Sequence, residues 1–396
     1  MTSTPLLSVA EAQARLLALA SPVTIERVPL AGAIGRWAAE DAYAGRTQPP
    51  AALSSMDGYA IRHTDMPGPW RVIGESAAGR PLARALGPGE AARIFTGAFV
   101  PDGADAVLIQ EETARDGDAL RLAGDGPPRP GANVRARGLD FATGDLLVRA
   151  GDRLTPARLA LLAAGGQPVI SVRRRVRVAL AATGDELSHD VSTDPSKTPE
   201  TNNLLLSALL ADLPVDLLDL GILPDDQAVL RSAFAGIEAD LLVTSGGASV
   251  GDHDLVRPAL LAAGGAIDFW RVAVRPGKPL MAGRLRDAVV LGLPGNPVSA
   301  YVTALLFVRP LIARLAGAAD PLPRTRTAVL GRDLPANGPR ADHLRAAHDA
   351  EGRVCAALVQ DSSMLRILAD SDCLIVRPPH APAARAGDSA EILPLC

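Results

Sequence analysis

The chain has 396 residues, of which 48% are hydrophobic and 21% are charged, a profile typical of a globular protein of about two to four domains. Aromatic residues make up only 3%, so we expect cores of leucine, valine, isoleucine and alanine. The net charge of −4 argues against a general nucleic-acid surface, and a small anionic ligand would need a local basic site.

The three cysteines, Cys355, Cys373 and Cys396, have no zinc-site spacing, and their odd number argues against a disulfide framework. Reduced thiols in a reducing compartment fit better. The N-terminus lacks the basic region and apolar run of a secretory signal, and no stretch reaches the roughly 18 apolar residues of a membrane span. The sequence therefore predicts a cytoplasmic protein.

The N-terminal third begins with a helix and continues into β-like pieces. Ser8 and Glu11 have the S-x-x-E spacing of a capping box and predict a helix over 12–20, followed by a strand over 23–28. Residues 47–101 are interrupted by proline and glycine and lack helical periodicity. Short strand-like runs at 59–61, 71–73, 93–95 and 106–110 predict a small β-rich module there.

From residue 175 the pattern changes to apolar strands alternating with helices. Strands are predicted over 176–183, 215–220, 239–244 and 288–293, and helices over 202–213, 225–237, 254–263 and 298–315. This alternation indicates parallel strands joined by right-handed crossovers, and hence a doubly wound α/β domain over 175–318. Short strand-like runs after residue 320 predict a small terminal β domain.

In an open α/β sheet, ligands bind in the loops that follow the strands. Four such loops have unusual chemistry, at 183–186, 224–226, 245–254 and 294–299. The third contains two adjacent glycines and two serines before a helix, so its backbone N–H groups are free to converge on a phosphate or another oxyanion. A plain tight strand–helix turn is the alternative, and it is favoured for this loop taken alone.

Acidic residues gather in the same loops: Glu186, Asp225, Asp226, Asp252 and Asp254. Carboxylates beside a phosphate cradle repel one another unless a cation joins them, and hard oxygen ligands suit Mg²⁺. Helix capping or a solvated surface position is the alternative, and it is favoured for any single one of them.

The basic counterpart is Arg271, Arg275 and Lys278, in the stretch 269–280. The two arginines are an even step apart, so on one strand they would share a face. Arginine forks bind tetrahedral oxyanions well, and lysine adds a point charge. A solvated strand end is an equal alternative. In the β-rich module, Asp57 is also open to a reading as a turn aspartate.

Taken together, the motifs resemble those of the molybdopterin molybdenumtransferase family, called MoeA in bacteria and matched by the C-terminal region of gephyrin. The similar stretches occur in family order, whereas the C-terminal part matches more weakly. They are SSMDGYAI at 54–61, FTGAFVPDGADAV at 95–107, NVRARGLDFATGD at 133–145, ATGDEL at 182–187, GILPDD at 221–226, TSGGASVGDHD at 244–254, RPGKPL at 275–280 and LPGNPVSA at 293–300.

The resemblance implies four parts in each subunit. They are a split N-terminal domain (1–46 and 141–174), an inserted β-rich module (47–140), a molybdopterin-binding α/β domain (175–318) and a C-terminal β barrel (319–396). It also implies an elongated homodimer. The active site would lie between the α/β domain of one subunit and the inserted module of the other.

The resemblance also implies roles for individual residues. As catalytic residues we expect Asp57, Asp140, Glu186, Asp225 and Asp254, and the last three also as ligands of Mg²⁺. We expect substrate binding by Thr96, Gly246, Gly247, Ser249, Arg271, Arg275, Pro276, Lys278, Pro294, Asn296, Ser299, Arg345 and Ser362. Arg271 and Arg275 stand where many relatives have lysine, and the match around Arg345 and Ser362 is loose.

The implied reaction inserts molybdenum from molybdate into adenylyl-molybdopterin, with release of AMP and with Mg²⁺ as cofactor. Two alternatives stay open. A molybdopterin adenylyltransferase would turn over ATP, and a non-catalytic scaffold of the gephyrin type would bind peptide without releasing AMP. Contact with the molybdopterin adenylyltransferase is a further implied partnership.

Overall fold

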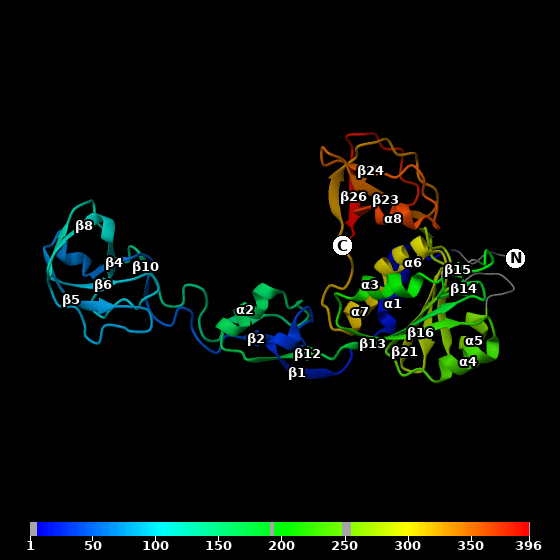
Figure 1. Cartoon of the computed structure of the whole chain (residues 1–396), viewed down its shortest axis with the longest axis horizontal. Coiled ribbons are helices and arrows are strands. Elements are labelled where there is room, and N and C mark those ends of the chain that lie inside the picture. Colours follow the sequence, from blue (N-terminus) through cyan, green and yellow to red (C-terminus); the bar gives the residue numbers. More distant parts are fainter. Residues whose placement is uncertain (1–5, 191–193, 248–254, 396) are drawn as a thin grey trace.

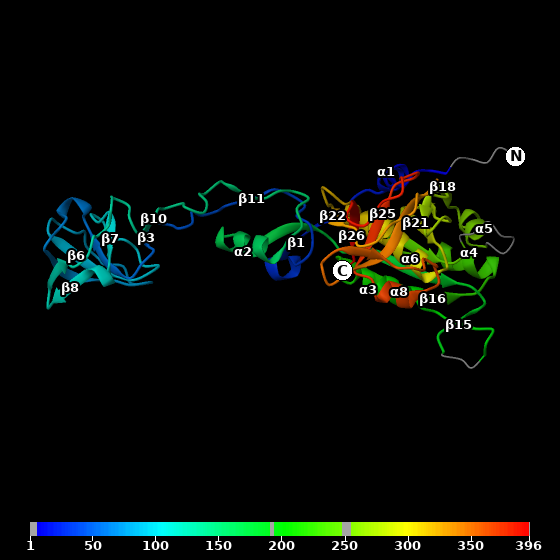
Figure 2. The same ribbon diagram turned by 90° about the horizontal axis from the view of Figure 1, so that it is seen from above.

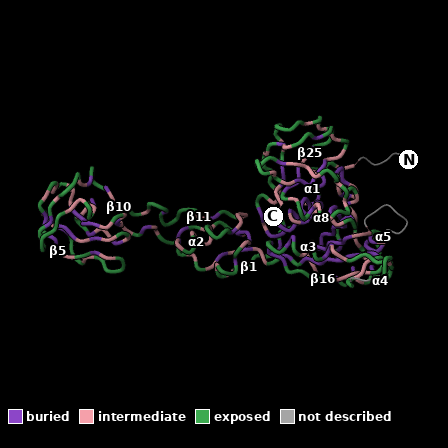
Figure 3. The backbone as a smooth tube through the Cα atoms, turned by 45° about the horizontal axis from the view of Figure 1, so that its top comes forward, coloured by how far each residue is buried: buried purple, intermediate pink, exposed green. Residues whose placement is uncertain are grey.

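A computed structural model of the chain describes residues 6–190, 194–247 and 255–395. The molecule is elongated, with a β-rich body at one end, a larger α/β body with a C-terminal sheet at the other, and a narrow middle segment between them (Figures 1 and 2). Buried residues are densest in the α/β body, and the middle segment has a small core of its own (Figure 3).

Helix α1 (Val9–Leu19) begins at the predicted capping box. Ser8 Oγ accepts from the Glu11 N–H at 3.1 Å, and the Glu11 carboxylate accepts from the Ser8 N–H at 3.3 Å. The helix packs on the α/β body, where Ala12 and Leu16 are fully buried in its core. The first predicted helix is therefore confirmed, and it joins a core formed by residues far away in the sequence.

The middle segment is built from two separated stretches of chain. Strand β1 (Ile25–Pro29) pairs with β12 (Val169–Arg173), and β2 (Ala42–Tyr43) pairs with β11 (Leu146–Val148), all antiparallel. The remaining elements are η1 (Leu30–Ala33) and α2 (Pro156–Ala164), which is capped by Thr155. Because strands on either side of the β-rich body pair here, that body is an insertion.

The inserted body contains a six-stranded sheet in the order β7-β4-β6-β5-β9-β8. Apolar side chains cover both faces, with Tyr59 and Leu108 in one core and Ala60 and Val107 in the other. This alternation confirms the predicted β-rich module. Its elements are β3 (Leu53–Ser54), β4 (Gly58–Ile61), η2 (His63–Asp65), β5 (Trp70–Ser76), β6 (Glu90–Ile94), β7 (Ala106–Ile109), η3 (Gln110–Glu112), β8 (Thr113–Asp116), β9 (Ala119–Leu122) and β10 (Val134–Arg135).

The α/β body contains a six-stranded sheet in the order β16-β13-β17-β21-β20-β18. Four strands are parallel, as predicted: β13 (Val176–Thr183), β16 (Val215–Leu223), β17 (Leu241–Ser245) and β21 (Ala288–Leu293). Two antiparallel strands at one edge, β18 (Ala266–Trp270) and β20 (Met281–Leu285), were not predicted.

Helices cover both faces of this sheet. One face packs on α3 (Asn202–Leu210) and on a continuous helix made of α6 (Pro297–Thr303), the π-helical turn η4 (Ala304–Val308) and α7 (Arg309–Leu315). The other face packs on α4 (Gln227–Ala235) and α5 (Val256–Ala262). The doubly wound arrangement is therefore confirmed.

The continuous helix Pro297–Leu315 is long and apolar enough to cross a bilayer, with a mean hydropathy of 1.5. The sequence analysis expected no uninterrupted stretch of roughly 18 apolar residues, and Arg309 and Arg314 do interrupt this one. Its most apolar window is 83% buried inside the protein, so the helix serves as a core helix.

The C-terminal sheet has the order β19-β23-β25-β26-β22, with β24 beside β23. Its first strand, β19 (Val274–Arg275), belongs to the α/β part of the chain and pairs in parallel with β23, so this sheet is attached to the α/β body. The other elements of this part are β22 (Arg326–Val329), β23 (Ala341–His348), β24 (Val354–Ala356), α8 (Leu365–Ala369), β25 (Cys373–Arg377) and β26 (Ser389–Pro394). Two short strands of the α/β part, β14 (Leu187–Ser188) and β15 (Thr198–Pro199), pair with each other in a separate sheet. The boundaries given above for four domains stay predictions.

Candidate functional site

A cleft of about 1090 Å³ lies at the carboxyl ends of the four parallel strands. The loops after these strands form one wall, residues 198–202 a second, and a C-terminal wall comes from Arg340, residues 360–363 and Leu365. Ten of the predicted site residues line it: Glu186, Asp225, Gly246, Gly247, Arg275, Pro276, Pro294, Asn296, Ser299 and Ser362. The predicted sheet edge thus brings most of them together.

The glycine turn after β17 depends on its two glycines. Gly246 and Gly247 have φ values of 90° and 59°. A Cβ on Gly246 would lie 2.4 Å from the Thr183 carbonyl oxygen, and one on Gly247 would lie 2.4 Å from Val256 Cγ2. The Gly246 N–H donates to the Leu293 carbonyl at 3.2 Å, so it fastens the turn to β21. Ser249, also predicted for this turn, lies outside the described residues.

Two buried oxygens of cleft residues have no hydrogen-bond partner among the described residues. They are the Ser245 hydroxyl oxygen and Asn202 Oδ1, and both residues line the cleft. The Asn202 amide nitrogen donates to the Gly295 carbonyl at 2.8 Å, which orients the side chain and holds the start of α3 against the β21–α6 loop. A buried acceptor left alone costs about 1–3 kcal/mol, so these oxygens favour a polar occupant.

Two of the predicted acids line the cleft. Glu186 follows β13 and Asp225 follows β16, and the Asp225 N–H donates to Asp185 Oδ1 at 3.1 Å, which links their loops. The neighbouring Asp226 has the capping role, since its Oδ1 accepts from the Ala228 and Val229 N–H groups at 2.8 and 2.9 Å. Asp252 and Asp254 lie outside the described residues.

The basic residues separate into two groups. Arg275 lines the cleft together with Arg340, a residue that the sequence did not single out, whereas Arg271 and Lys278 are absent from the described lining. The expectation that Arg271 and Arg275 share the face of one strand is wrong. Strand β18 ends at Trp270, Arg271 has a φ of 92°, and its guanidinium lies 5.0 Å from the centroid of the Trp270 ring.

Arg345 lies behind the C-terminal wall. Its side chain in β23 is buried, with Nε donating to Gln360 Oε1 at 3.1 Å and Nη1 to the Asp361 carbonyl at 2.7 Å. Ser362, which does line the cleft, accepts from Asn296 Nδ2 at 2.9 Å. The C-terminal sheet therefore shapes this wall through Arg345 and joins it directly to the β21–α6 loop.

Sequence reasoning missed Glu200, Asn202, Arg340 and Gln360, which line the cleft. Asn202 could have been found, because it begins a predicted helix that follows the first strand of the sheet. Arg340 and Gln360 enter from the C-terminal part, where the resemblance pointed only loosely to Arg345 and Ser362.

Asp57, Thr96 and Asp140 are remote from the cleft within one chain. The β3–β4 loop places Asp57 in the inserted body, at the opposite end of the molecule (Figure 1). Asp57 Oδ1 accepts from the Thr96 N–H at 2.7 Å and from its hydroxyl at 2.8 Å, and these bonds hold the pKa of Asp57 below its usual value. Asp140 is exposed where the chain leaves the inserted body.

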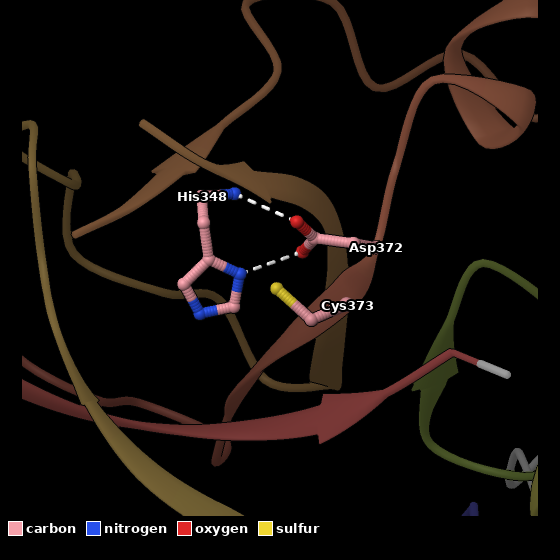
Figure 4. A group of neighbouring side chains, drawn as sticks. All are labelled: His348, Asp372 and Cys373. Carbon is pink, nitrogen blue, oxygen red and sulfur yellow. Dashed lines mark hydrogen bonds and ion pairs between the residues drawn. The ribbon is translucent and has the colours of Figure 1, made fainter. Parts of the chain in front are cut away.

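A second cluster, at the edge of the C-terminal sheet, contains His348, Asp372 and Cys373 (Figure 4). Their potential ligand atoms lie within 4.8 Å of one another, although the cysteine spacing in the sequence fits no zinc pattern. Asp372 already accepts from the His348 N–H and pairs with its ring Nδ1, both at 3.0 Å. Burial raises the pKa of the Cys373 thiol to about 12, which disfavours the thiolate that a metal requires.

Comparison with known proteins covers nearly the whole chain. Residues 7–166 match the family model described as the MoeA N-terminal region (domain I and II), residues 179–314 the probable molybdopterin binding domain, and residues 327–395 the MoeA C-terminal region (domain IV).

Individual relatives match over nearly their full length. The molybdopterin molybdenumtransferase of Haemophilus influenzae is 35% identical over 98% of both chains, and the molybdopterin molybdenumtransferase 2 of Mycobacterium tuberculosis is 34% identical over 96% of both. A crystal structure of the molybdopterin biosynthesis moeA protein from Pyrococcus horikoshii OT3 superimposes with a TM-score of 0.85 at 27% identity, over 99% of this chain and 100% of that one. The resemblance and the fold class expected from the motifs are confirmed.

Proposed function

Because the chain belongs to the MoeA family of molybdopterin molybdenumtransferases, we propose that it inserts molybdenum from molybdate into adenylyl-molybdopterin and releases AMP. The observation that carries this proposal is the cleft, where a glycine turn, two acids and two arginines from separate parts of the chain lie together. Its volume of about 1090 Å³ is at the upper end for small-molecule sites and suits a nucleotide-sized substrate better than an oxyanion alone.

The residues that line the cleft support two binding regions, one for the adenylyl-pterin substrate and one for molybdate. The Ser245 hydroxyl and Asn202 amide oxygens offer unused hydrogen-bonding capacity beside the glycine turn, which suits the adenylyl-pterin substrate. Arg275 and Arg340 supply forked donors and positive charge for molybdate, a tetrahedral oxyanion. In this proposal Arg275 and Arg340 contact molybdate, and Arg345 acts indirectly by holding Gln360 and the main chain of Asp361.

The donor set at the acidic edge fits Mg²⁺. Glu186 and Asp225 both face the cleft, and one or two carboxylates with substrate phosphate oxygens form a common Mg²⁺ site. Asp254, outside the described residues, is the third ligand in this proposal. A bound Mg²⁺ would neutralise charge on the substrate's diphosphate. The link from the Asp225 N–H to Asp185 keeps the two loops that carry Glu186 and Asp225 together.

We also propose that two copies form a homodimer in the cytoplasm, with the inserted body of one covering the cleft of the other. The position of Asp57 and Thr96, far from their own cleft and on the surface of the inserted body, supports this arrangement. Asp140, exposed near that body, would join them at the neighbouring cleft. A contact with the adenylyltransferase that supplies adenylyl-molybdopterin would complete the set of partners.

The test is release of AMP from adenylyl-molybdopterin by the purified full-length chain. We expect release that depends on both molybdate and Mg²⁺. No molybdate-dependent release from the folded protein would overturn the proposal. ATP turnover with molybdopterin would support an adenylyltransferase instead, and peptide binding without AMP release would support a scaffold.

A further inference from the structure

The Arg275 side chain forms an ion pair with Asp342, an acid of the C-terminal sheet. Its guanidinium Nη2 donates to Asp342 Oδ2, and the two side chains are exposed to very different degrees. The Arg275 side chain is 53% exposed and lines the cleft, whereas the Asp342 side chain is only 5% exposed and is not part of the lining. The carboxylate thus lies beneath the guanidinium, on the side away from the cleft.

The main chain fixes this arrangement. Strands β19 and β23 pair in parallel, with Arg275 aligned to Asp342, and the Ala341 N–H donates to the Ala273 carbonyl at 2.8 Å. On its other side, Asp342 is aligned with Arg377 of β25. The acid therefore lies on a strand that is paired on both sides, and it is buried there.

The ion pair between Arg275 and Asp342 is not explained by a contribution to the stability of the fold. Burial raises the pKa of Asp342 above its ordinary value, although Arg275 and, more weakly, Arg340 and Arg377 act in the opposite direction. The cost of removing the carboxylate from water therefore exceeds what its positive neighbours return. Buried ion pairs are weak evidence for stability, and a half-exposed arginine gains little stability from one.

We propose that Asp342 is a positioning residue that orients the Arg275 guanidinium for the oxyanion bound in the cleft, an inference that rests on the proposed function. Arginine has five N–H donors in a rigid fork. With one Nη2 N–H bonded to Asp342, the second N–H of Nη2 and the donors on Nε and Nη1 remain available for oxygens of a tetrahedral anion. A lysine at this position would have only one nitrogen for both partners.

The experiment compares Asp342→Asn with wild type in the full-length chain. The Asn side chain is nearly the same size, so we expect the thermal midpoint to stay the same or rise. We expect KM for molybdate in AMP release to rise about tenfold, with a smaller change in kcat, because one charge-assisted hydrogen bond to Arg275 is lost. Asp372→Asn, in the same sheet but away from the cleft, is the matched control and should leave both parameters unchanged.

A double-mutant cycle separates positioning from general damage. Asp342→Asn should have little further effect in an Arg275→Ala background, and Asp342→Glu should restore part of the affinity. An equal rise in KM in both backgrounds, or no rise in either, overturns the proposal. If Asp342→Asn does not fold, Arg275→Lys decides, because it should weaken molybdate binding by a similar factor, and wild-type binding by this variant would refute the proposal.

Direct binding of molybdate, measured by calorimetry without the pterin substrate, distinguishes this inference from the proposed function. If wild type binds molybdate but releases no AMP, the proposed function fails, and the effect of Asp342→Asn on binding still tests the positioning role. If wild type releases AMP and the variant binds molybdate equally well, only the positioning role fails.

Discussion

Glu186 and Asp225 lie in a cleft with arginines, a glycine turn and buried acceptors around them, whereas Asp57 and Thr96 bond to one another at the other end of the chain. The first region has hydrogen-bonding capacity left for a ligand. In the second, the acid's hydrogen bonds to Thr96 already hold it in place without a ligand. The difference supports the proposal above, in which the cleft binds the substrate and the inserted body of a second copy presents a preorganised carboxylate to it.

The largest effect is expected when the cleft is inactivated in one subunit and the inserted body in the other. Asp57→Asn and Glu186→Gln should each lower AMP release on the order of 100- to 10,000-fold if both residues take part in the reaction. In a homodimer with shared sites, mixing the two inactive variants after dissociation should recover about a quarter of wild-type activity, because mixed dimers contain one undamaged site.

Mixing either variant with itself is the control and should recover nothing. If the mixture of Asp57→Asn and Glu186→Gln stays inactive while size measurements show that subunits exchange, the two regions do not share a site. Full activity of Asp57→Asn alone would remove the inserted body from the chemistry.

A second test uses two glycines with positive φ, one in each region. Gly246→Ala should lower AMP release by about 100-fold, because its Cβ would lie 2.4 Å from the Thr183 carbonyl and must displace the turn. Gly117→Ala, in the β8–β9 turn, has a φ of 56° and nothing within 4 Å of the new Cβ. It should cost only about 1 kcal/mol of backbone strain and leave activity within a few fold.

AMP release and thermal unfolding of both variants provide the measurement. Similar activity losses in Gly246→Ala and Gly117→Ala would mean that the close approach between the glycine turn and β13 has no bearing on the chemistry. A stable, fully active Gly246→Ala protein would have the same meaning.

Acid should destabilise the C-terminal sheet and the inserted body in different pH ranges. Burial lowers the pKa of His343 in β23 to about 4, so its stabilising contribution is complete above pH 6.5 and is lost as the pH falls towards 4. The shift corresponds to at most about 3 kcal/mol. In the inserted body, hydrogen bonds from Arg84 and then Gly87 hold the pKa of Glu90 at about 2, so its contribution is complete above pH 4.5 and is lost only as the pH falls through about 2.

Hydrogen exchange, corrected for its intrinsic pH dependence, reads the two regions separately. Between pH 7 and 4.5 we expect protection to fall in β23 and β25 and to persist in β4 and β6. His343→Gln should make protection of β23 much less dependent on pH. Equal loss of protection in both regions would contradict the assignment to His343.

The strands and helices that were predicted correctly each have a recognisable residue pattern of their own. The central parallel strands Leu241–Ser245 and Ala288–Leu293 are almost entirely apolar and fully buried, because helices cover both faces of the sheet. The edge strands Ala266–Trp270 and Met281–Leu285 escaped prediction, since each is short and Arg271 breaks the chain between them at a positive φ.

The parts of the site that were missed depend on pairing between distant segments. Arg340 and Asp342 reach Arg275 only through the β19–β23 register, which no periodicity in either segment reveals. Likewise, His348 and Cys373 approach each other because β23 pairs with β25. The family motifs predicted Asp57 and Thr96 as site residues, but a single chain's sequence pattern gives no distance between them and the cleft.

The smallest expected effect on stability concerns the contact between the middle segment and the α/β body. Asp212 follows α3 and accepts from Arg309 Nη1 and Nη2 at 2.6 and 2.9 Å. Arg153 of the middle segment also donates to Asp212, to its carbonyl at 2.8 Å and to its Oδ2 at 3.3 Å. Asp212→Asn should cost about 1 kcal/mol or less, because the side chain is half exposed and the bond to the main chain remains.

The informative readout for Asp212→Asn is the spread of distances between spin labels on the inserted body and on the α/β body. If this contact holds the inserted body ready to meet a neighbouring cleft, this spread should widen modestly. Asp216→Asn is the matched control, because its partner Arg175 lies at the start of the same sheet and the pair does not reach the middle segment. An unchanged spread would mean that the paired strands β1–β12 and β2–β11 alone set the relation between the two regions.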